Sequence, residues 1–155
     1  MLKKWLLLTL LCLGLNAPVL AVELKVGDTL PPITLKNQHD KPITVAADVQ
    51  TLLFTIEKPA SDLVNDYLLK QDKAFLSSKQ AYFLADISGM PSMITKMFAI
   101  PKMQERPYDI LLAYDAQEAA FMPRQKNHVT MVKMEAGKVA EILFVKDEAG
   151  LADNF

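Results

Sequence analysis

Three methionines could supply soft metal ligands in this chain. Met90, Met93 and Met97 follow one another at helical spacing, which places them on one side of a helix. Thioether sulfur suits Cu(I), so this spacing permits a copper site. The same stripe contains Ile94 and Phe98, and methionine is a flexible filler of hydrophobic cores. We therefore expect the stripe to face the core, and we keep methionine-based Cu(I) binding as the alternative function.

Histidines and carboxylates offer little further metal or acid–base chemistry. His39 and His128 are the only histidines, and neither has another histidine or a cysteine at metal-ligand spacing. Glu57, Asp109 and Asp115 lie beside predicted strands, where a carboxylate could act as a general acid or base. Acids in such places usually belong to turns or solvated faces, so an enzyme that uses Glu57 and Asp109 is a weaker alternative.

Nucleotide and flavin chemistry lacks its motifs. Four glycines follow residue 21, namely Gly27, Gly89, Gly137 and Gly150, and no two are close enough to form a phosphate-binding loop or a dinucleotide fingerprint. A Gly-x-Ser-x-Gly nucleophile elbow does not occur either. We therefore expect no cofactor, and the sequence favours no enzymatic activity.

The first 21 residues have the pattern of a secretory signal peptide. Lys3 and Lys4 precede an apolar run over residues 5–15, and a small residue, Ala21, ends the segment. A membrane anchor needs roughly 18 apolar residues, more than this run contains. We therefore expect a signal peptide over residues 1–21, a single domain over residues 22–155, and a periplasmic or secreted protein with no stable membrane span after cleavage.

Cleavage after Ala21 would remove the only cysteine, Cys12. The processed chain could then form no disulfide and would depend on its hydrophobic core, for which its length is sufficient. The whole chain has a net charge of −1, and loss of Lys3 and Lys4 makes the remainder more acidic. We expect no nucleic-acid partner, because phosphate binding requires a basic excess.

Strand patterns place two hairpins around a central parallel pair. Extended segments at residues 33–35 and 43–45 flank a turn and predict an N-terminal hairpin. Further strands are predicted at residues 51–56, 81–85, 108–114, 129–134 and 139–145. The last two form a C-terminal hairpin. The strands at 51–56 and 81–85 are joined by a helix, which favours parallel pairing with cover on both faces of the sheet.

Helix signals fill the segments between these strands. A helix begins near Pro59, with Ser61 as the residue that caps its first turn. A second helix begins at Pro91 and ends at Pro101, because proline starts helices and interrupts them. A short helix is predicted over residues 115–121. The segment after residue 145 is short for a final helix.

Several phrases of the sequence resemble those of redoxins. Residues 26–35 are similar to the redoxin opening G-x-x-x-P-x-f-x-L, residues 37–41 to the turn d-x-x-G-k, and residues 129–139 to the hairpin t-f-v-i-D-x-d-G-k-v. The chain thus resembles thioredoxin-like proteins of the peroxiredoxin arrangement, and among them the small exported, cysteine-less YtfJ family. This resemblance implies an α/β fold: a mixed sheet with an N-terminal hairpin, flanking helices and a C-terminal hairpin.

The chain departs from these relatives at the point where they react. Where a peroxiredoxin has its reactive cysteine, the sequence reads Pro59-Ala60-Ser61, and a serine hydroxyl is not ionised near neutral pH. The cis-proline or arginine that usually precedes the last hairpin is replaced around Asn127 and His128.

We therefore predict a non-catalytic binding or accessory module of the cell envelope, whose partner is a protein or a small ligand. Ligands of parallel α/β sheets bind at the carboxyl ends of the strands. The predicted contact surface at these ends consists of Glu57, Lys58, Pro59, Ala60, Ser61, Asp62, Lys126, Asn127 and His128.

Overall fold

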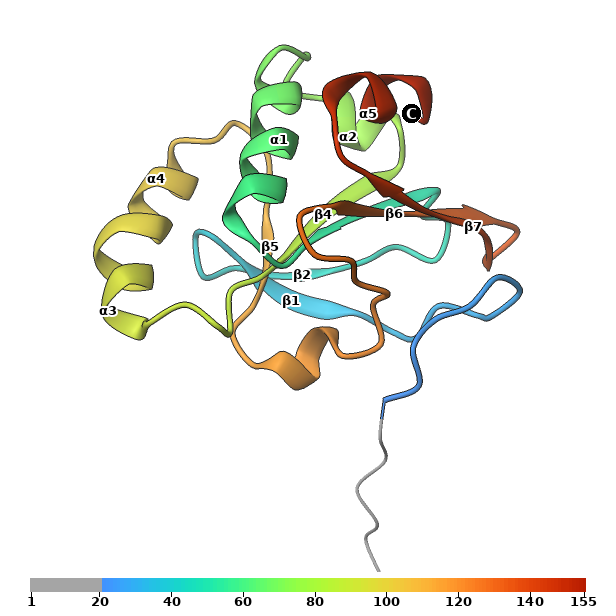
Figure 1. Cartoon of the computed structure of the whole chain (residues 1–155), viewed down its shortest axis with the longest axis horizontal. Coiled ribbons are helices and arrows are strands. Elements are labelled where there is room, and N and C mark those ends of the chain that lie inside the picture. Colours follow the sequence, from blue (N-terminus) through green and yellow to red (C-terminus); the bar gives the residue numbers. More distant parts are fainter. Residues whose placement is uncertain (1–20) are drawn as a thin grey trace, which may run out of the picture.

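A computed structural model describes residues 21–155, so the predicted signal peptide lies outside the described residues except for Ala21. The fold is built on a seven-stranded mixed sheet with strand order β2-β1-β5-β4-β3-β6-β7 (Figure 1). Strand β3 (Thr51–Thr55) pairs in parallel with β4 (Ala81–Asp86), which pairs in parallel with β5 (Leu111–Ala113). All other neighbouring strands are antiparallel. The predicted α/β class and mixed sheet are confirmed.

Both predicted hairpins are present at the two edges of the sheet. Strands β1 (Thr34–Asn37) and β2 (Pro42–Thr44) form the N-terminal hairpin, and β6 (Val129–Glu135) and β7 (Lys138–Val145) form the C-terminal one. The second hairpin turns through Ala136 and Gly137, whose φ angles are 50° and 76°. Two consecutive positive φ angles match the twist of the flanking strands, which explains the short turn.

The central strand β3 supplies side chains to two separate cores. Leu53 belongs to the core on one face of the sheet, whereas its neighbours Leu52 and Phe54 belong to the core on the other face. Successive side chains of a strand point to opposite faces, so a strand with apolar residues at consecutive positions must be covered on both. Every residue of β3 is buried, which fits this requirement.

Helices cover the first face and irregular segments cover the second. The first core, named here the helical-face core, receives side chains from α1 (Lys58–Leu69), α2 (Phe75–Ser78) and α5 (Glu148–Asp153), which lie on one side of the sheet in Figure 1. The second core receives Leu24, Ile33 and Met122 from the N-terminal segment and from the region around the 3-10 helix η2 (Ala116–Ala119). Helix α5 occupies the end of the chain for which no helix was expected, and the Asp147 carboxylate accepts the backbone N–H of Gly150 at its start.

The segment after β4 continues as a helix beyond the predicted end at Pro101. It comprises α3 (Ser92–Ile94), the π-helix η1 (Thr95–Ala99) and α4 (Ile100–Gln104), and residues 92–104 are called the helical lobe below. Pro101 lies in the first turn of α4, where the missing N–H of proline is tolerated. The expectation that Pro101 ends the helix is therefore wrong.

Strand β5 is shorter than predicted, because residues 108–110 bond to a side chain instead of a strand. The buried Gln38 amide donates to the Tyr108 carbonyl at 2.7 Å and accepts the Ile110 N–H at 2.8 Å. A side chain thus satisfies backbone groups that a neighbouring strand would otherwise pair.

No helix within residues 21–155 has the length and apolar character to cross a membrane.

Candidate functional site

The two halves of the predicted contact surface lie together at the carboxyl edge of the parallel strands. Residues 57–62 follow the end of β3 and form the first turn of α1, and residues 126–128 immediately precede β6. The Glu57 carboxylate accepts the backbone N–H of Asn127 at 2.7 Å. Asn127 has a φ angle of 60°, a left-handed conformation that asparagine adopts more readily than most residues. This hydrogen bond fixes the loop before β6 against the β3–α1 junction.

Ser61 does not cap helix α1 as predicted. The helix begins at Lys58 with Glu57 as its N-cap residue, so Ser61 lies inside the first turn, where its N–H bonds to the Glu57 carbonyl at 3.0 Å. Pro59 fits near the helix start because it needs no donor there. The Ser61 hydroxyl is 2.7 Å from the hydroxyl of Thr55, the last residue of β3. The side chain therefore links helix to strand.

The remaining residues of the predicted surface differ in their access to solvent. Ala60 is 2% exposed and packs in the helical-face core, so it cannot contribute to an exposed surface. Lys58 and Asp62 form an ion pair one turn apart along α1. The half-buried His128 has its Nδ1 at 2.8 Å from the Lys126 carbonyl. The exposed part of this edge therefore presents the paired charges of Lys58 and Asp62 to solvent.

Sequence reasoning missed an arginine at this edge. Arg124 lies with its guanidinium carbon 5.3 Å from the centre of the Phe54 ring, and its Nη1 donates to the Asp86 carboxylate at 3.2 Å. The Asp86 side chain, at the end of β4, is 6% exposed and also accepts the Ser88 hydroxyl at 2.6 Å. The arginine charge is thus neutralised within the chain. The only sequence signal for this pair was an acid at a strand end.

The carboxylates proposed for acid–base catalysis do not meet. Glu57 follows the carboxyl end of β3, whereas Asp109 precedes the amino end of β5, and these strands run in the same direction. The two acids therefore lie near opposite ends of the parallel strands. Asp109 accepts the Asn37 amide at 2.7 Å, and Asp115 caps η2. A catalytic pair formed by Glu57 and Asp109 is excluded by this topology.

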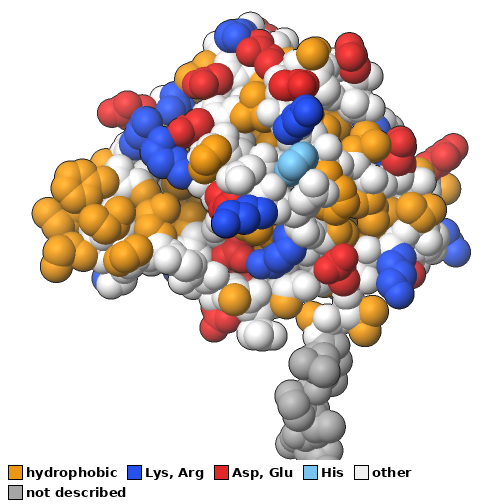
Figure 2. Space-filling view, viewed as in Figure 1, with side chains coloured by type: hydrophobic (Ala, Val, Ile, Leu, Met, Phe, Trp, Pro, Cys, Tyr) orange, Lys and Arg blue, Asp and Glu red, His pale blue; other side chains and the backbone are white. Residues whose placement is uncertain are grey.

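The methionine stripe does not face the core as expected. Met93 and Met97 are 68% and 61% exposed. Their neighbours Ile94 and Phe98 are 45% and 63% exposed. Figure 2 shows hydrophobic side chains gathered on the protruding part of the molecule where Figure 1 places the helical lobe. Met90 instead packs against the helical-face core. The three proposed copper ligands are thus divided between core and surface.

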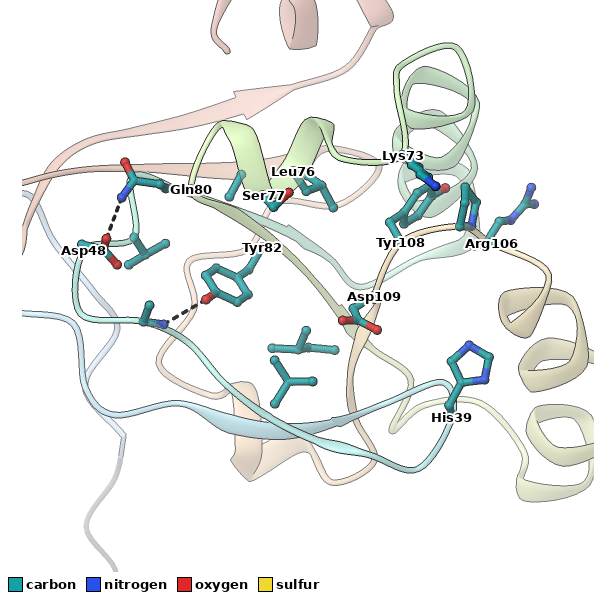
Figure 3. A pocket seen from close by; sticks show the side chains of 16 residues that line it. His39, Asp48, Lys73, Leu76, Ser77, Gln80, Tyr82, Arg106, Tyr108 and Asp109 are labelled. Carbon is teal, nitrogen blue, oxygen red and sulfur yellow. Dashed lines mark hydrogen bonds between the residues drawn. The ribbon is translucent and has the colours of Figure 1, made fainter.

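A cavity of about 520 Å³ lies near the amino ends of β4 and β5, at the opposite end of the parallel strands from the predicted contact surface. Residues of the β1–β2 hairpin, the α2 region and the segment before β5 line it (Figure 3). Lys73 and Arg106 lie toward one end of the cavity, and Asp48, which accepts the Gln80 amide at 2.7 Å, lies toward the other. Burial raises the pKa of Tyr108, in the cavity wall, to about 12.

The cavity can accept an anionic group at its basic end. Among residues 21–155, no ion pair involves Lys73 or Arg106, whereas the two acids of the wall, Asp48 and Asp109, each accept a side-chain amide. His39, exposed in the β1–β2 turn, also lines the cavity. Within the same residues, histidine, cysteine, aspartate and glutamate form no group of three that could hold a metal ion.

Comparison with solved structures identifies the fold. A candidate protein disulfide isomerase from Bacteroides thetaiotaomicron superposes with a TM-score of 0.58 at 15% sequence identity, over 86% of this chain and 87% of that one. The peroxidoxin BcpB from Mycobacterium tuberculosis gives 0.54 at 15% identity, over 84% and 93%. The fold is thioredoxin-like. A thio-disulfide isomerase from Thermus thermophilus, at 0.52 and 16% identity over 84% and 94%, agrees.

Sequence comparison adds no closer relative, since no family model and no curated protein matches the chain. At these identities the structural likeness shows the thioredoxin-like fold alone. The named neighbours are two disulfide isomerases and a peroxidoxin, but residues 21–155 of this chain contain no cysteine. The carboxyl edge of this chain holds Ser61 and the Glu57–Asn127 contact.

Proposed function

We propose that this thioredoxin-like chain is a non-catalytic binding or accessory module of the cell envelope, and that it contacts a partner protein through the carboxyl edge of its sheet. The observation that carries the proposal is the hydrogen bond from the Asn127 N–H to the Glu57 carboxylate at 2.7 Å. It joins two loops into one preformed surface, and a preformed surface loses little conformational freedom when a partner binds.

The hydroxyls and charges at this edge support recognition better than covalent chemistry. Ser61 is hydrogen-bonded to Thr55, Arg124 is paired with Asp86, and Lys58 is paired with Asp62. No histidine accepts a hydrogen bond from Ser61 within the described residues, so the hydroxyl has no base to activate it. Charged groups in a fixed arrangement contribute specificity and association rate at a protein interface.

Site-specific photocrosslinking in cells tests this surface. A crosslinking residue placed at Lys58 or Asn127 should give the same discrete adduct, and one placed at Lys138, the exposed first residue of β7, should not. The double swap Lys58→Asp with Asp62→Lys keeps the ion pair but reverses the charge pattern, so it should abolish the adduct without loss of stability. Adducts that form equally at Lys138, or that survive the swap, would contradict the proposal.

An activity assay tests the non-catalytic part of the proposal separately. The purified chain from Val22 onward should neither reduce insulin disulfides nor consume hydrogen peroxide above the buffer rate, because it contains no thiol. Turnover in either assay that is lost in Ser61→Ala would refute it.

The cavity at the opposite edge gives a second candidate function, the binding of a small anionic ligand. Lys73 and Arg106 without ion-pair partners in the described chain are the observation that favours it. Titration with succinate or inorganic phosphate, followed by amide NMR shifts, should perturb cavity residues, and Arg106→Gln should remove the effect. Lys102→Gln, which lies outside the cavity lining, serves as the control. Shifts that are equal in both variants would rule the cavity out.

The copper alternative retains only two of its three ligands at the surface. Met93 and Met97 are exposed one helical turn apart, whereas Met90 packs against the helical-face core. A Cu(I) site on this lobe would therefore need ligands from elsewhere. Competition with a Cu(I) chelator decides the matter: affinity that is unchanged in Met93→Leu with Met97→Leu eliminates the site, and affinity lost in that variant supports it.

A further inference from the structure

The helical lobe exposes an apolar surface formed by four large side chains. Met93, Met97 and Phe98 are 68%, 61% and 63% exposed, and Ile94 is 45% exposed. They come from α3 and the π-helix η1 and protrude from the molecule (Figure 2). This lobe surface is the largest cluster of exposed hydrophobic side chains along the described chain, since the others occur singly or beside the N-terminal end.

The lobe is anchored from its other side, so these four side chains are not needed for its packing. Thr95 is buried and its hydroxyl donates to the Pro91 carbonyl at 3.2 Å. Ile100 and Met103 pack against the helical-face core. The Tyr108 hydroxyl, just after the lobe, donates to the Asn65 side chain of α1 at 2.8 Å. π-Helical turns often occur at functional sites, and here the π-helix carries two of the four exposed side chains.

The charge around the lobe surface is positive. Residues 90–104 contain Lys96 and Lys102, both exposed, and no aspartate or glutamate. Glu105 follows the lobe directly, and Asp40 lines a small hollow with Lys96 but is paired with Lys36. The chain as a whole has a net charge of −1, so this basic and apolar segment differs from the rest of the molecule.

The charge on the lobe surface argues against a dimer through it, because two copies would bring Lys96 and Lys102 of each copy close together. Four side chains of about 200 Å² each, 45–68% exposed, offer on the order of 450 Å² of apolar surface. A specific protein interface buries about 800 Å² on each partner, somewhat over half of it apolar, so the area alone does not decide against a second copy. A convex group of apolar side chains beside lysines matches instead what a lipid surface requires, where apolar groups enter the boundary region and lysines meet anionic headgroups.

We propose that the helical lobe binds an anionic lipid surface, with Met93, Ile94, Met97 and Phe98 inserted among the lipids and Lys96 and Lys102 at the headgroups. The protein then lies on a membrane without crossing it. Methionine suits this role because its flexible side chain adapts to an irregular apolar environment. The lobe is distinct from the carboxyl-edge surface, so this inference is independent of the partner proposed for that edge.

Vesicle sedimentation of the chain from Val22 onward tests the proposal. This form contains both cores, and it omits the apolar run at residues 5–15, which would itself bind lipid. It should sediment with phosphatidylglycerol–phosphatidylcholine vesicles. Phe98→Asp should weaken binding by about ten-fold or more, because it places a charge among the lipids. Phe144→Asp, at an exposed aromatic residue of β7, should leave binding unchanged.

Lysine variants test the electrostatic half of the proposal. Lys96→Gln and Lys102→Gln should each weaken binding to anionic vesicles by about five-fold, the contribution of one lysine near such a surface. Binding to phosphatidylcholine alone should be weak for all forms. Equal binding to both vesicle types, or equal binding by Phe98→Asp and the unmodified chain, would overturn the proposal.

A tryptophan at position 98 reports the environment of the lobe directly. Trp5 is the only tryptophan of the sequence, so Phe98→Trp gives a single emitter in the chain from Val22 onward. Its emission should shift to shorter wavelength when anionic vesicles are added. A shift that appears without lipid and grows with protein concentration, together with dimers in sedimentation velocity, would assign the lobe to a second copy and refute the lipid surface.

Discussion

The carboxyl edge of the sheet and the helical lobe are neighbours along the chain, because the lobe follows directly from β4. They meet solvent in opposite ways. At the carboxyl edge, polar side chains are bonded within the chain, as in the Glu57–Asn127 and Arg124–Asp86 contacts. On the lobe, apolar side chains such as Met97 and Phe98 are exposed and have no cover within the described chain.

The difference shows which surface of this thioredoxin-like fold gains more stabilisation when a partner covers it. A polar edge whose groups are already bonded loses as much as it gains when it forms new hydrogen bonds, so it favours selective contacts of modest strength. Covering an exposed apolar surface with another apolar group lowers the free energy, because it removes both surfaces from water. Among residues 21–155, no buried side-chain nitrogen or oxygen lacks a hydrogen-bond partner, so buried polar groups offer no further binding capacity.

The largest expected effect on stability comes from a charged substitution at the buried Ala60. Ala60→Arg should lower the free energy of unfolding by about 3 kcal/mol or more, because the site is 2% exposed and has no room for a long charged side chain. Urea unfolding measures the change. Asp62→Arg, in the same turn but with a side chain that is 46% exposed, is the matched control and should cost far less. Equal midpoints would mean that the first turn of α1 is not packed as described.

A smaller effect is expected from breaking the contact that joins the two halves of the edge. Glu57→Ala should lower the free energy of unfolding by about 1–2 kcal/mol, since it removes a charged acceptor from the Asn127 N–H and an anion from the start of α1. Amide hydrogen exchange at Asn127 should accelerate. Glu57→Gln keeps an acceptor oxygen and should recover part of the loss. If Asn127 exchanges equally in all three forms, the loops are not coupled.

The sequence was informative where one physical rule decides the outcome. The run at residues 51–56 is mostly apolar and is followed by Pro59 three residues later, so a buried central strand followed by a helix was predictable. The C-terminal hairpin was predictable because strands of alternating character flank Gly137, which adopts a positive φ angle. These signals are local, and they sufficed for the fold class and for the order of the strands along the chain, whereas the final helix α5 was missed.

Features that depend on distant segments were not predictable. The stripe of Met93 and Met97 has helical spacing, but spacing identifies one face of a helix without saying what that face contacts. The Arg124–Asp86 pair and the cavity near Lys73 and Arg106 combine segments that are far apart in sequence. Ser61 was misplaced as a cap because Glu57 starts the helix four residues earlier with its backbone alone.

A pH-dependent effect tests how the lobe is tied to α1. Burial raises the pKa of Tyr108 to about 12, above the value near 10 expected for an unfolded chain. The unfolded state therefore loses this proton first, and the contribution of Tyr108 to stability, complete below about pH 10, is lost as the pH rises toward 12. Tyr108→Phe should remove this part of the pH dependence, and it should cost about 1 kcal/mol at neutral pH through the lost bond to Asn65.

Urea midpoints of both forms across this pH range provide the measurement, because the other titrating groups are common to the two proteins. Parallel curves for Tyr108→Phe and the unmodified chain would show that the phenol is not held apart from solvent.

The smallest effect on stability, and the most direct contrast between surface and core, is expected from methionine oxidation. Met93 and Met97 are mostly exposed, whereas Met122 and Met131 are fully buried in the two cores. Dilute hydrogen peroxide should convert the first pair to sulfoxides well before the second, which can react only when the structure opens. Because the lobe side chains support no packing, their oxidation should change the free energy of unfolding by less than about 0.5 kcal/mol.

Peptide mass spectrometry measures the sites, and their order separates two states of the lobe. Early oxidation of Met93 and Met97 in the chain from Val22 onward means that the lobe surface is open in solution, and protection of both by anionic vesicles means that lipid covers it. If the two methionines are instead protected without lipid, at protein concentrations where the chain is monomeric, then the chain itself covers the lobe. The contrast between a hydrogen-bonded polar edge and an uncovered apolar lobe would then be wrong.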